Sequence, residues 1–190
     1  YNRQLEYKLR EAEIISTLRH LKGAKYPYEE IRDIYKIYNP GENEVRALDG
    51  ISLNVEHGEF LAIVGQSGSG KSTLMNMLGL LDIPTSGTYT LDGVDVKDMT
   101  DDELSEIRNK EIGFIFQGFN LIPSLTAVEN VELPLVYRGM KKEERNKLAL
   151  EALERVGLSH RLDHLPKQMS GGQQQRVAIA RAVAARPPII

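Results

Sequence analysis

The sequence has 190 residues, a formal net charge of −3, and neither cysteine nor tryptophan. This length suffices for one domain of ordinary size with a small appendage. The near-neutral charge argues against nucleic acid as the main partner, and the lack of cysteine excludes disulfides and thiolate metal sites. The sequence contains no apolar run of the 18 or so residues that a membrane span needs, so any membrane role must go through a partner chain.

The first 28 residues differ in pattern from the rest of the chain. Apolar residues recur there every three or four positions between charged ones, which predicts an amphipathic helix that ends near Gly23 and Pro27. We assign residues 1–30 to an N-terminal helical extension of unknown role, which packs on its own domain, on nothing, or on a partner. Because the chain begins with Tyr1 and not methionine, we expect it to be a fragment.

Short strand patterns dominate from residue 31 onward. "IRDIYKIY" at 31–38 and "ISLNV" at 51–55 are typical of strands, and Asp92-Gly93 within "GTYTLDGVDV" predicts a tight hairpin. The continuous apolar run "FLAIVG", Phe60–Gly65, instead predicts a strand buried on both faces of a parallel sheet. Together these segments predict a small antiparallel layer beside a parallel core.

The stretch that follows this apolar run contains a phosphate-binding loop. Its spacing, G-x-x-x-x-G-K-S, lies between the predicted strand and the helical pattern of "KSTLMNMLGLL". In such a loop backbone N–H groups surround phosphate oxygens, Lys71 reaches the β- and γ-phosphates, and the Ser72 hydroxyl binds Mg²⁺. A flexible serine-glycine turn before an ordinary helix is the alternative. The candidate ATP-binding residues are Gly65, Gln66, Ser67, Gly68, Ser69, Gly70, Lys71, Ser72 and Thr73.

Helix signals follow the hairpin. A long helix is predicted from about residue 141 to 156 and ends at Gly157, whereas Pro134 should kink or end the helix before it. Two helix starts carry the T-x-x-E capping box, Thr100 with Glu103 and Thr126 with Glu129.

A second candidate anion site lies near the end of the sequence. In "MSGGQQQRVAIARA" Ser170 can cap a helix, and Gly171 and Gly172 allow a ligand to approach the backbone where the helix dipole begins. A well-capped amphipathic helix without a ligand is an equally good interpretation of this segment alone.

Taken in order, these motifs resemble the ATP-binding (nucleotide-binding) domain of ABC transporters. "MSGGQQQRVAIARA" is similar to the signature motif of that family, "FIFQGFNLIPSLTAVENVELPL" is similar to its Q-loop with Gln117 at the glutamine position, and Tyr38 matches the aromatic residue that stacks on adenine. The resemblance covers residues 31–190 and is strongest to the macrolide-export and lipoprotein-release branch. It implies an α/β fold with a P-loop NTPase core, a parallel sheet, a small antiparallel β layer and a helical subdomain.

Two departures from the family pattern concern the signature and the end of the sequence. Met169 replaces the usual leucine, a volume-conserving change. The sequence stops at Ile190, before the strand that ends in the family's Asp-Glu pair (Walker B), so the resemblance places the catalytic glutamate beyond Ile190 and makes the ATP-binding domain at 31–190 incomplete.

The resemblance also implies a mechanism. Two copies pack head to tail, and ATP binds between the phosphate loop of one copy and the signature residues of the other, Ser170, Gly171, Gly172 and Gln173. Lys71 and Gln117 would take part in ATP hydrolysis, and Ser72 and Gln117 would bind Mg²⁺. The domain would lie peripherally at the cytoplasmic face of the cell membrane and drive a separate membrane permease, for export or lipoprotein release.

Other functions share parts of this pattern. A small-molecule kinase or GTPase would use the phosphate loop but not the signature segment. A soluble cassette of the translation or DNA-repair type, or a cassette that drives a membrane partner to signal or to regulate the cell wall, fits the same motifs.

Overall fold

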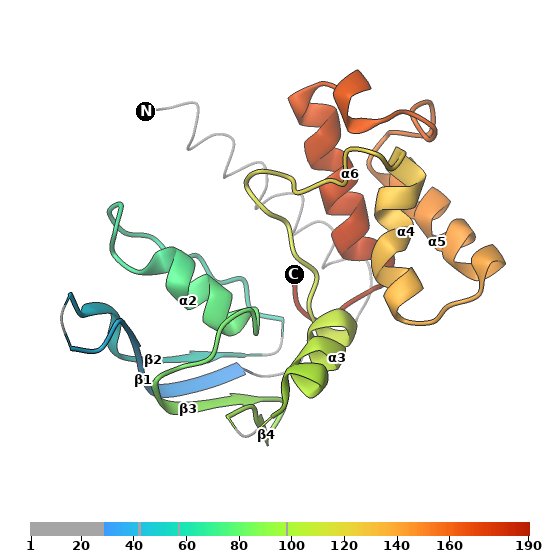
Figure 1. The fold of residues 1–190 in the computed structure, drawn as a ribbon. Coiled ribbons are helices and arrows are strands. Elements are labelled where there is room, and N and C mark those ends of the chain that lie inside the picture. Colours follow the sequence, from blue (N-terminus) through green and yellow to red (C-terminus); the bar gives the residue numbers. More distant parts are fainter. Residues whose placement is uncertain (1–28, 42, 57, 98) are drawn as a thin grey trace. The chain divides into compact units, whose positions relative to one another are not determined.

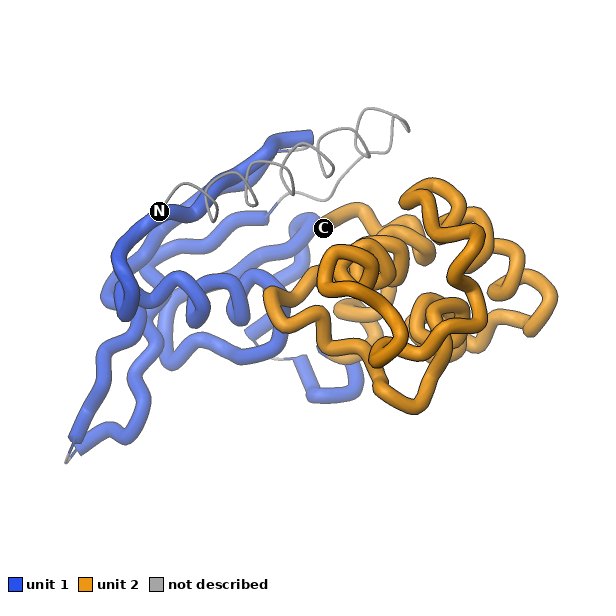
Figure 2. Tube along the Cα trace, turned by 90° about the horizontal axis from the view of Figure 1, so that it is seen from above, with its two compact units in different colours: residues 1–104 blue, residues 105–190 orange. Residues whose placement is uncertain are grey.

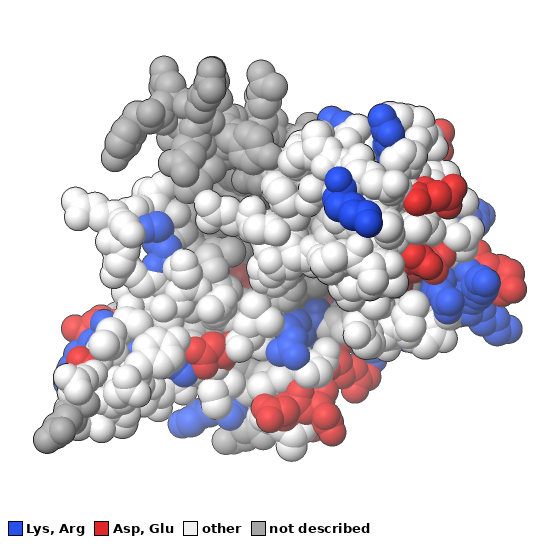
Figure 3. Space-filling model, turned by 45° about the horizontal axis from the view of Figure 1, so that its top comes forward, with Lys and Arg blue, Asp and Glu red and all other residues white. Residues whose placement is uncertain are grey.

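The computed structural model describes residues 29–41, 43–56, 58–97 and 99–190. The chain forms two compact units, residues 1–104 and residues 105–190 (Figure 2). The predicted N-terminal amphipathic helix lies outside the described residues, and Glu29 and Glu30 of the predicted extension belong to the first strand. Basic and acidic side chains form small neighbouring clusters on the face drawn in Figure 3.

The first unit contains a four-stranded antiparallel sheet (Figure 1). Its strands are β1 (Glu29–Tyr38), β2 (Val45–Val55), β3 (Ser86–Leu91) and β4 (Val94–Asp95), in the order β2-β1-β3-β4. Leu91 pairs with Val94, and both residues of the loop between them are left-handed, Asp92 with φ 47° and Gly93 with φ 78°. The predicted two-residue hairpin and antiparallel layer are therefore confirmed.

A bulge in β1 decides which residues reach the core. Ile31 pairs with Leu53 and Ile34 with Ile51, so β1 has one more residue than β2 over this interval, and Asp33 there has φ 46°. The bulge brings Ile31 and Ile34 to the same buried face although they are three residues apart. A strictly alternating strand would have placed one of them in solvent.

Helix α2 (Lys71–Leu78) lies over one face of this sheet (Figure 1). Leu74, Met77 and Leu78 are its buried residues, as the helical spacing predicts. The buried Tyr89 of β3 lies against it, with the phenol oxygen 2.9 Å from the Leu78 carbonyl oxygen. The helix thereby fixes its own N-terminus, and the loop before it, relative to the sheet.

The predicted strand at Phe60–Gly65 is wrong for this structure. These residues carry no strand pairing in the part of the chain that is described, and Val64 is 88% exposed and Phe60 48% exposed. A strand buried on both faces needs neighbours on both sides that pair with its backbone, and none of the described strands pairs with this run. Parallel pairing among the described residues is limited to the bridge between Ile112 and Ile189.

The second unit is helical. Helix α3 (Asp101–Glu111) crosses the division between the units, and α4 (Ala127–Tyr137), α5 (Lys142–Arg155), the 3-10 turn η1 (Pro166–Gln168) and α6 (Gly171–Ala184) follow. Helices α4, α5 and α6 pack against one another (Figure 1). The fully buried residues between them are small or β-branched or are leucines, which lets the helices approach closely: Ala127, Val131, Leu135, Ala149, Leu153, Val177, Ala178 and Ala180.

Local signals predicted most helix ends. Thr126 and Glu129 form the predicted capping box of α4, and Thr100 and Glu103 exchange the corresponding bonds at the start of α3. Gly157, with φ 71°, follows α5 as predicted.

Pro134 does not end its helix. It lies inside α4, which continues to Tyr137. Proline removes one backbone hydrogen bond, but burial of Val131 and Leu135 on either side of it holds the helix together. The Pro134 carbonyl still accepts from the Arg138 N–H at 3.2 Å and from Asn109 Nδ2 at 3.1 Å.

Candidate nucleotide-binding site

The loop before α2 requires glycine at position 70 and has little room for a side chain at position 65. Gly70 has φ 82°, and a Cβ there would lie 2.3 Å from the Ala47 carbonyl oxygen. A Cβ on Gly65 would lie 2.6 Å from Ser69 Oγ. Side chains at these positions would push the loop away from β2 or fill its interior, so glycine keeps the backbone free to surround a ligand.

The Lys71 side chain contacts the backbone of its own loop. Its ammonium donates to the carbonyl oxygens of Gly65 at 2.7 Å and Gln66 at 2.5 Å, and to Ser69 Oγ at 3.3 Å. The positive charge therefore lies at the loop itself, where phosphate oxygens would be stronger partners than neutral carbonyls.

The start of α2 suits an anion. No described side chain caps this helix, and its first turn carries no acidic residue. The unpaired N–H groups and the positive end of the α2 dipole thus remain available to a phosphate group.

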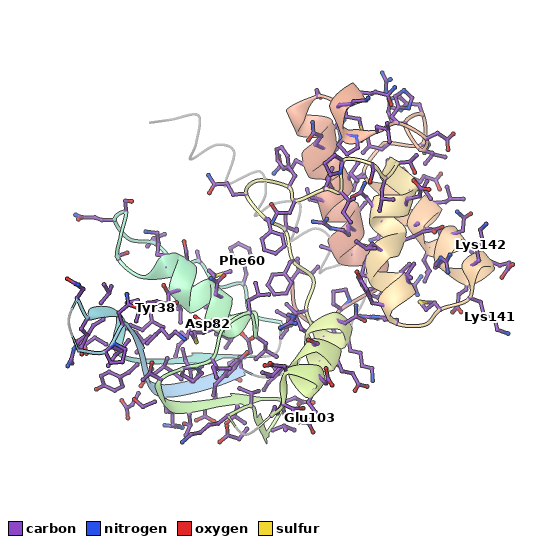
Figure 4. The ribbon with its side chains drawn as sticks, viewed as in Figure 1. Tyr38, Phe60, Asp82, Glu103, Lys141 and Lys142 are labelled. Atoms are coloured by element: carbon purple, nitrogen blue, oxygen red, sulfur yellow. The ribbon has the colours of Figure 1, made fainter. Side chains whose placement is uncertain are left out.

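The structure brings Tyr38 close to this helix. Tyr38 is the last residue of β1, and its hydroxyl donates to Asp82 Oδ2 at 2.8 Å, in the segment that follows α2 (Figure 4). The bond to Asp82 is the main reason why the pKa of Tyr38 is raised, and the neighbouring Thr73 side chain of α2 opposes that shift in part. The ring is 38% exposed, so it can accept a planar group beside the phosphate loop.

Sequence reasoning missed two residues around Tyr38. Lys36 lies two residues earlier in β1, on the same side of the strand, so period-two alternation could have found it. Asp82 is 44 residues from Tyr38, and no local pattern connects the two.

Gln117 lies in an exposed turn of the second unit. The two residues after Gly118 both have left-handed backbones, Phe119 with φ 62° and Asn120 with φ 48°. Arg181 of α6 donates to their carbonyl oxygens at 2.8 Å and 2.6 Å. The turn that carries Gln117 is therefore tied to α6, the helix that begins at the signature residues.

The signature residues form a helix start that is open to the outside. Ser170 Oγ accepts from the Gln173 N–H at 3.3 Å, and Gln173 Oε1 accepts from the Ser170 N–H at 2.9 Å, so the predicted cap is confirmed. A Cβ added to Gly171 or Gly172 would meet no described atom within 4 Å. A ligand or a partner can therefore approach this backbone closely.

The predicted site residues thus fall into two groups. Tyr38 and Gly65–Thr73 belong to the first unit, and Gln117 and Ser170–Gln173 to the second. Among the described residues no cluster of three or more His, Asp or Glu side chains could hold a metal ion by itself. Magnesium would fit here through the Ser72 hydroxyl together with phosphate oxygens, since Mg²⁺ commonly binds through one or two protein ligands and a substrate phosphate.

Comparison with known proteins identifies the family. Residues 48–190 match the family described as ABC transporter. The chain belongs to the ABC transporter family. It is 57% identical to the ABC transporter ATP-binding protein YvrO of Bacillus subtilis over 160 residues, which are 84% of this chain and 70% of YvrO. It is 54% identical to the macrolide export ATP-binding/permease protein MacB of Hyphomonas neptunium, over 83% of this chain but 24% of MacB.

A solved structure agrees with the sequence comparison. The ABC transporter cassette MJ0796 superposes with a TM-score of 0.79 at 51% identity, covering 85% of this chain and 72% of that one. Its structure is described as dimeric, and a second structure of it is described as a post-hydrolysis state bound to ADP and Pi.

These findings confirm the predicted ABC ATP-binding domain of the macrolide-export branch and the α/β P-loop NTPase fold. The chain is an ABC ATP-binding subunit of a transporter and, by class, an ATPase. Among the described residues, no helix combines the length and apolar character needed to cross a bilayer.

Proposed function

We propose that the first unit binds ATP through its phosphate loop and Tyr38. The observation that carries this proposal is the loop itself. Gly65 and Gly70 leave its backbone free of side chains, the ammonium group of Lys71 lies against it, and α2 starts without a side-chain cap. The triphosphate replaces the carbonyls that Lys71 now contacts. The base stacks on Tyr38, which lies at the same helix through Thr73.

Gly65, Gln66, Ser67, Gly68, Ser69, Gly70, Lys71, Ser72 and Thr73 hold the phosphates in this proposal. Ser72 of the first unit and Gln117 of the second would each supply a ligand for Mg²⁺, which would provide positive charge against the phosphates during hydrolysis. Lys71 adds a second positive charge at the terminal phosphates. Gln117 helps to orient the ligands of the metal at these phosphates.

The second group of residues acts on the ATP of another copy. Ser170, Gly171, Gly172 and Gln173 offer an open helix start, which is suited to an anion held by a facing subunit. The dimeric structure of the related cassette MJ0796 supports a head-to-tail dimer for this chain. ATP then joins two subunits, and hydrolysis releases them.

The dimer drives a separate membrane permease. The similarity to MacB, whose name describes an ATP-binding/permease protein for macrolide export, supports export or lipoprotein release as the process. The subunit lies peripherally at the cytoplasmic face of the cell membrane, with the permease as its protein partner. In this proposal the ATP-binding domain comprises residues 31–190 together with Glu29 and Glu30, which belong to β1.

Nucleotide titration of Lys71→Ala in the full chain tests the ATP site. Removing the one side-chain cation aimed at the terminal phosphates should abolish detectable ATP binding. The matched control is Lys97→Ala, which removes a cation from the same unit outside the loop and should leave ATP binding unchanged. Equal affinity of Lys71→Ala and the unaltered protein would overturn the phosphate-loop assignment.

A further inference from the structure

The carboxylate of Asp82 connects two separate parts of the first unit. Its Oδ2 accepts from the Tyr38 hydroxyl at 2.8 Å, and its Oδ1 accepts from the Lys36 ammonium at 2.6 Å and from the Ile83 N–H at 2.9 Å. The acceptor therefore ties the end of β1 to the segment after α2 (Figure 4). Partial burial opposes ionisation of Asp82, but the bonds from Lys36 and Tyr38 prevail and lower its pKa.

Lys36 restrains the same tyrosine from another direction. Its Nζ lies 5.0 Å from the centroid of the Tyr38 ring and also donates to the Ile83 carbonyl oxygen at 2.8 Å. The ammonium is thus held over one face of the ring by two acceptors. A planar ligand must stack on the opposite face.

We propose that Asp82 is a positioning residue for nucleobase recognition, which fixes the Tyr38 ring at its hydroxyl and, through Lys36, at one face before the nucleotide arrives. This inference rests on the proposed ATP site and deepens it. A ring that is already held loses little rotational freedom when a base stacks on it, so binding is tighter than to a free tyrosine. The restraint on Tyr38 therefore strengthens binding of the base and does not affect binding of the phosphates.

The test compares two probes, Mg²⁺·ATP and Mg²⁺·tripolyphosphate, which share the phosphate chain and differ in the nucleoside, the base with its ribose. In the full chain, Asp82→Ala should weaken ATP binding by about two- to tenfold, the cost of immobilising one side chain. Its affinity for tripolyphosphate should not change. Asp49→Ala, which removes an exposed carboxylate from β2 of the same unit, is the control and should alter neither affinity.

Tyr38→Phe provides a second measurement that keeps the ring and removes only its bond to Asp82. It should weaken ATP binding by no more than Asp82→Ala, which also releases Lys36. The double variant should lose no more than Asp82→Ala alone, because that change already removes the bond between Asp82 and Tyr38. If Asp82→Ala fails to fold, Tyr38→Phe with the two probes carries the test. Three results would overturn the proposal: losses that add up in the double variant, a loss of tripolyphosphate affinity in Tyr38→Phe that equals its loss of ATP affinity, or unchanged ATP affinity in either single variant.

The same measurements distinguish failure of the proposed ATP site from failure of the positioning role of Asp82. If Lys71→Ala leaves both affinities unchanged, the proposed function fails and this inference fails with it. If Lys71→Ala loses both probes while Asp82→Ala and Tyr38→Phe bind ATP normally, the ATP site stands and only the positioning role is refuted.

Discussion

The hydroxyl of Tyr89 has one proton to donate and two oxygen atoms within hydrogen-bond distance. Its phenol oxygen lies 3.0 Å from Glu29 Oε1 and 2.9 Å from the Leu78 carbonyl oxygen, and both side chains are buried. A hydroxyl donates one hydrogen bond at a time. Both contacts are hydrogen bonds together only when Glu29 is protonated and donates to the phenol, which then donates to Leu78. The link between the sheet and α2 therefore favours the acid form of Glu29.

This arrangement makes the stability of the first unit depend on pH. Burial raises the pKa of Glu29 above its ordinary 4.5; a hydrogen bond donated by the Tyr89 hydroxyl would favour the ionised form, but burial outweighs it. The Glu29 carboxyl group thus holds its proton more tightly in the folded chain than in the unfolded chain. Its contribution to the stability of the fold is therefore complete below pH 4.5 and is lost as the pH rises through the raised pKa.

Glu29→Gln should remove this dependence, because its amide donates to the phenol at every pH. The difference in the free energy of unfolding between Glu29→Gln and the unaltered chain should be near zero at low pH and grow in favour of the variant as the pH rises. Denaturant unfolding at a series of pH values measures it, with Glu30→Gln on the same strand as the control. A difference that is independent of pH would contradict the protonated-acid interpretation.

Among single residues, those that act through local geometry could be predicted from the sequence. The phosphate-loop glycines and the Asp92-Gly93 turn follow from the spacing of a few neighbours. Asp82 could not be predicted, because its role arises from a contact with a residue 44 positions away. Glu29 likewise acquires its raised pKa only once Tyr89 and the sheet enclose it.

At the level of secondary-structure elements, Arg138 connects the ends of two helices. Its guanidinium donates to the carbonyl oxygens of Asn109 and Lys110 near the end of α3, both at 2.7 Å, and to that of Ala185 at the end of α6, also at 2.7 Å. The last carbonyls of a helix have no partner within the helix itself. One side chain at the end of α4 therefore satisfies two helix termini.

Arg138→Met should destabilise the second unit by about 2–4 kcal/mol, since charged hydrogen bonds are lost and the carbonyls of two helix ends are left unpaired. Thermal or urea unfolding measures the loss. Arg155→Met, an exposed substitution at the end of α5, should change stability by less than about 0.5 kcal/mol. Equal stability of the two variants would mean that solvent satisfies these carbonyls as well as Arg138 does.

Helix starts could be predicted from neighbouring residues, whereas strand pairing depends on residues far away in the sequence. The starts of α3, α4 and α6 could be predicted because each cap lies within four residues of the helix it begins. The run Phe60–Gly65 could not be assigned correctly, because a fully buried strand depends on its neighbours in the sheet and not on its own apolar residues. Of the two outcomes expected at Pro134, a kink or an end of the helix, the end does not occur, because the packing of α4 outweighs one lost hydrogen bond.

For the whole molecule, the two groups of site residues have complementary chemistry. The first unit supplies a cation, a glycine-lined loop and an aromatic ring, and the second supplies an open helix start at Ser170 and the turn that carries Gln117. Under the proposed function each ATP needs the loop of one copy and the signature residues of another. ATP should therefore control association of the subunits.

The most direct test of this central claim is light scattering of the full chain with and without ATP under non-hydrolysing conditions. The unaltered protein should double its mass with ATP, and Lys71→Ala should stay monomeric because it binds none. Gly172→Asp should still bind ATP, since a side chain there meets no described atom, but should not dimerise, because its carboxylate would face the γ-phosphate of the facing subunit. Gly172→Ala, which adds no charge, should retain ATP-induced association. If Gly172→Asp dimerises with ATP as readily as the unaltered protein, the signature segment is only a helix cap and the account of ATP as a link between subunits is wrong.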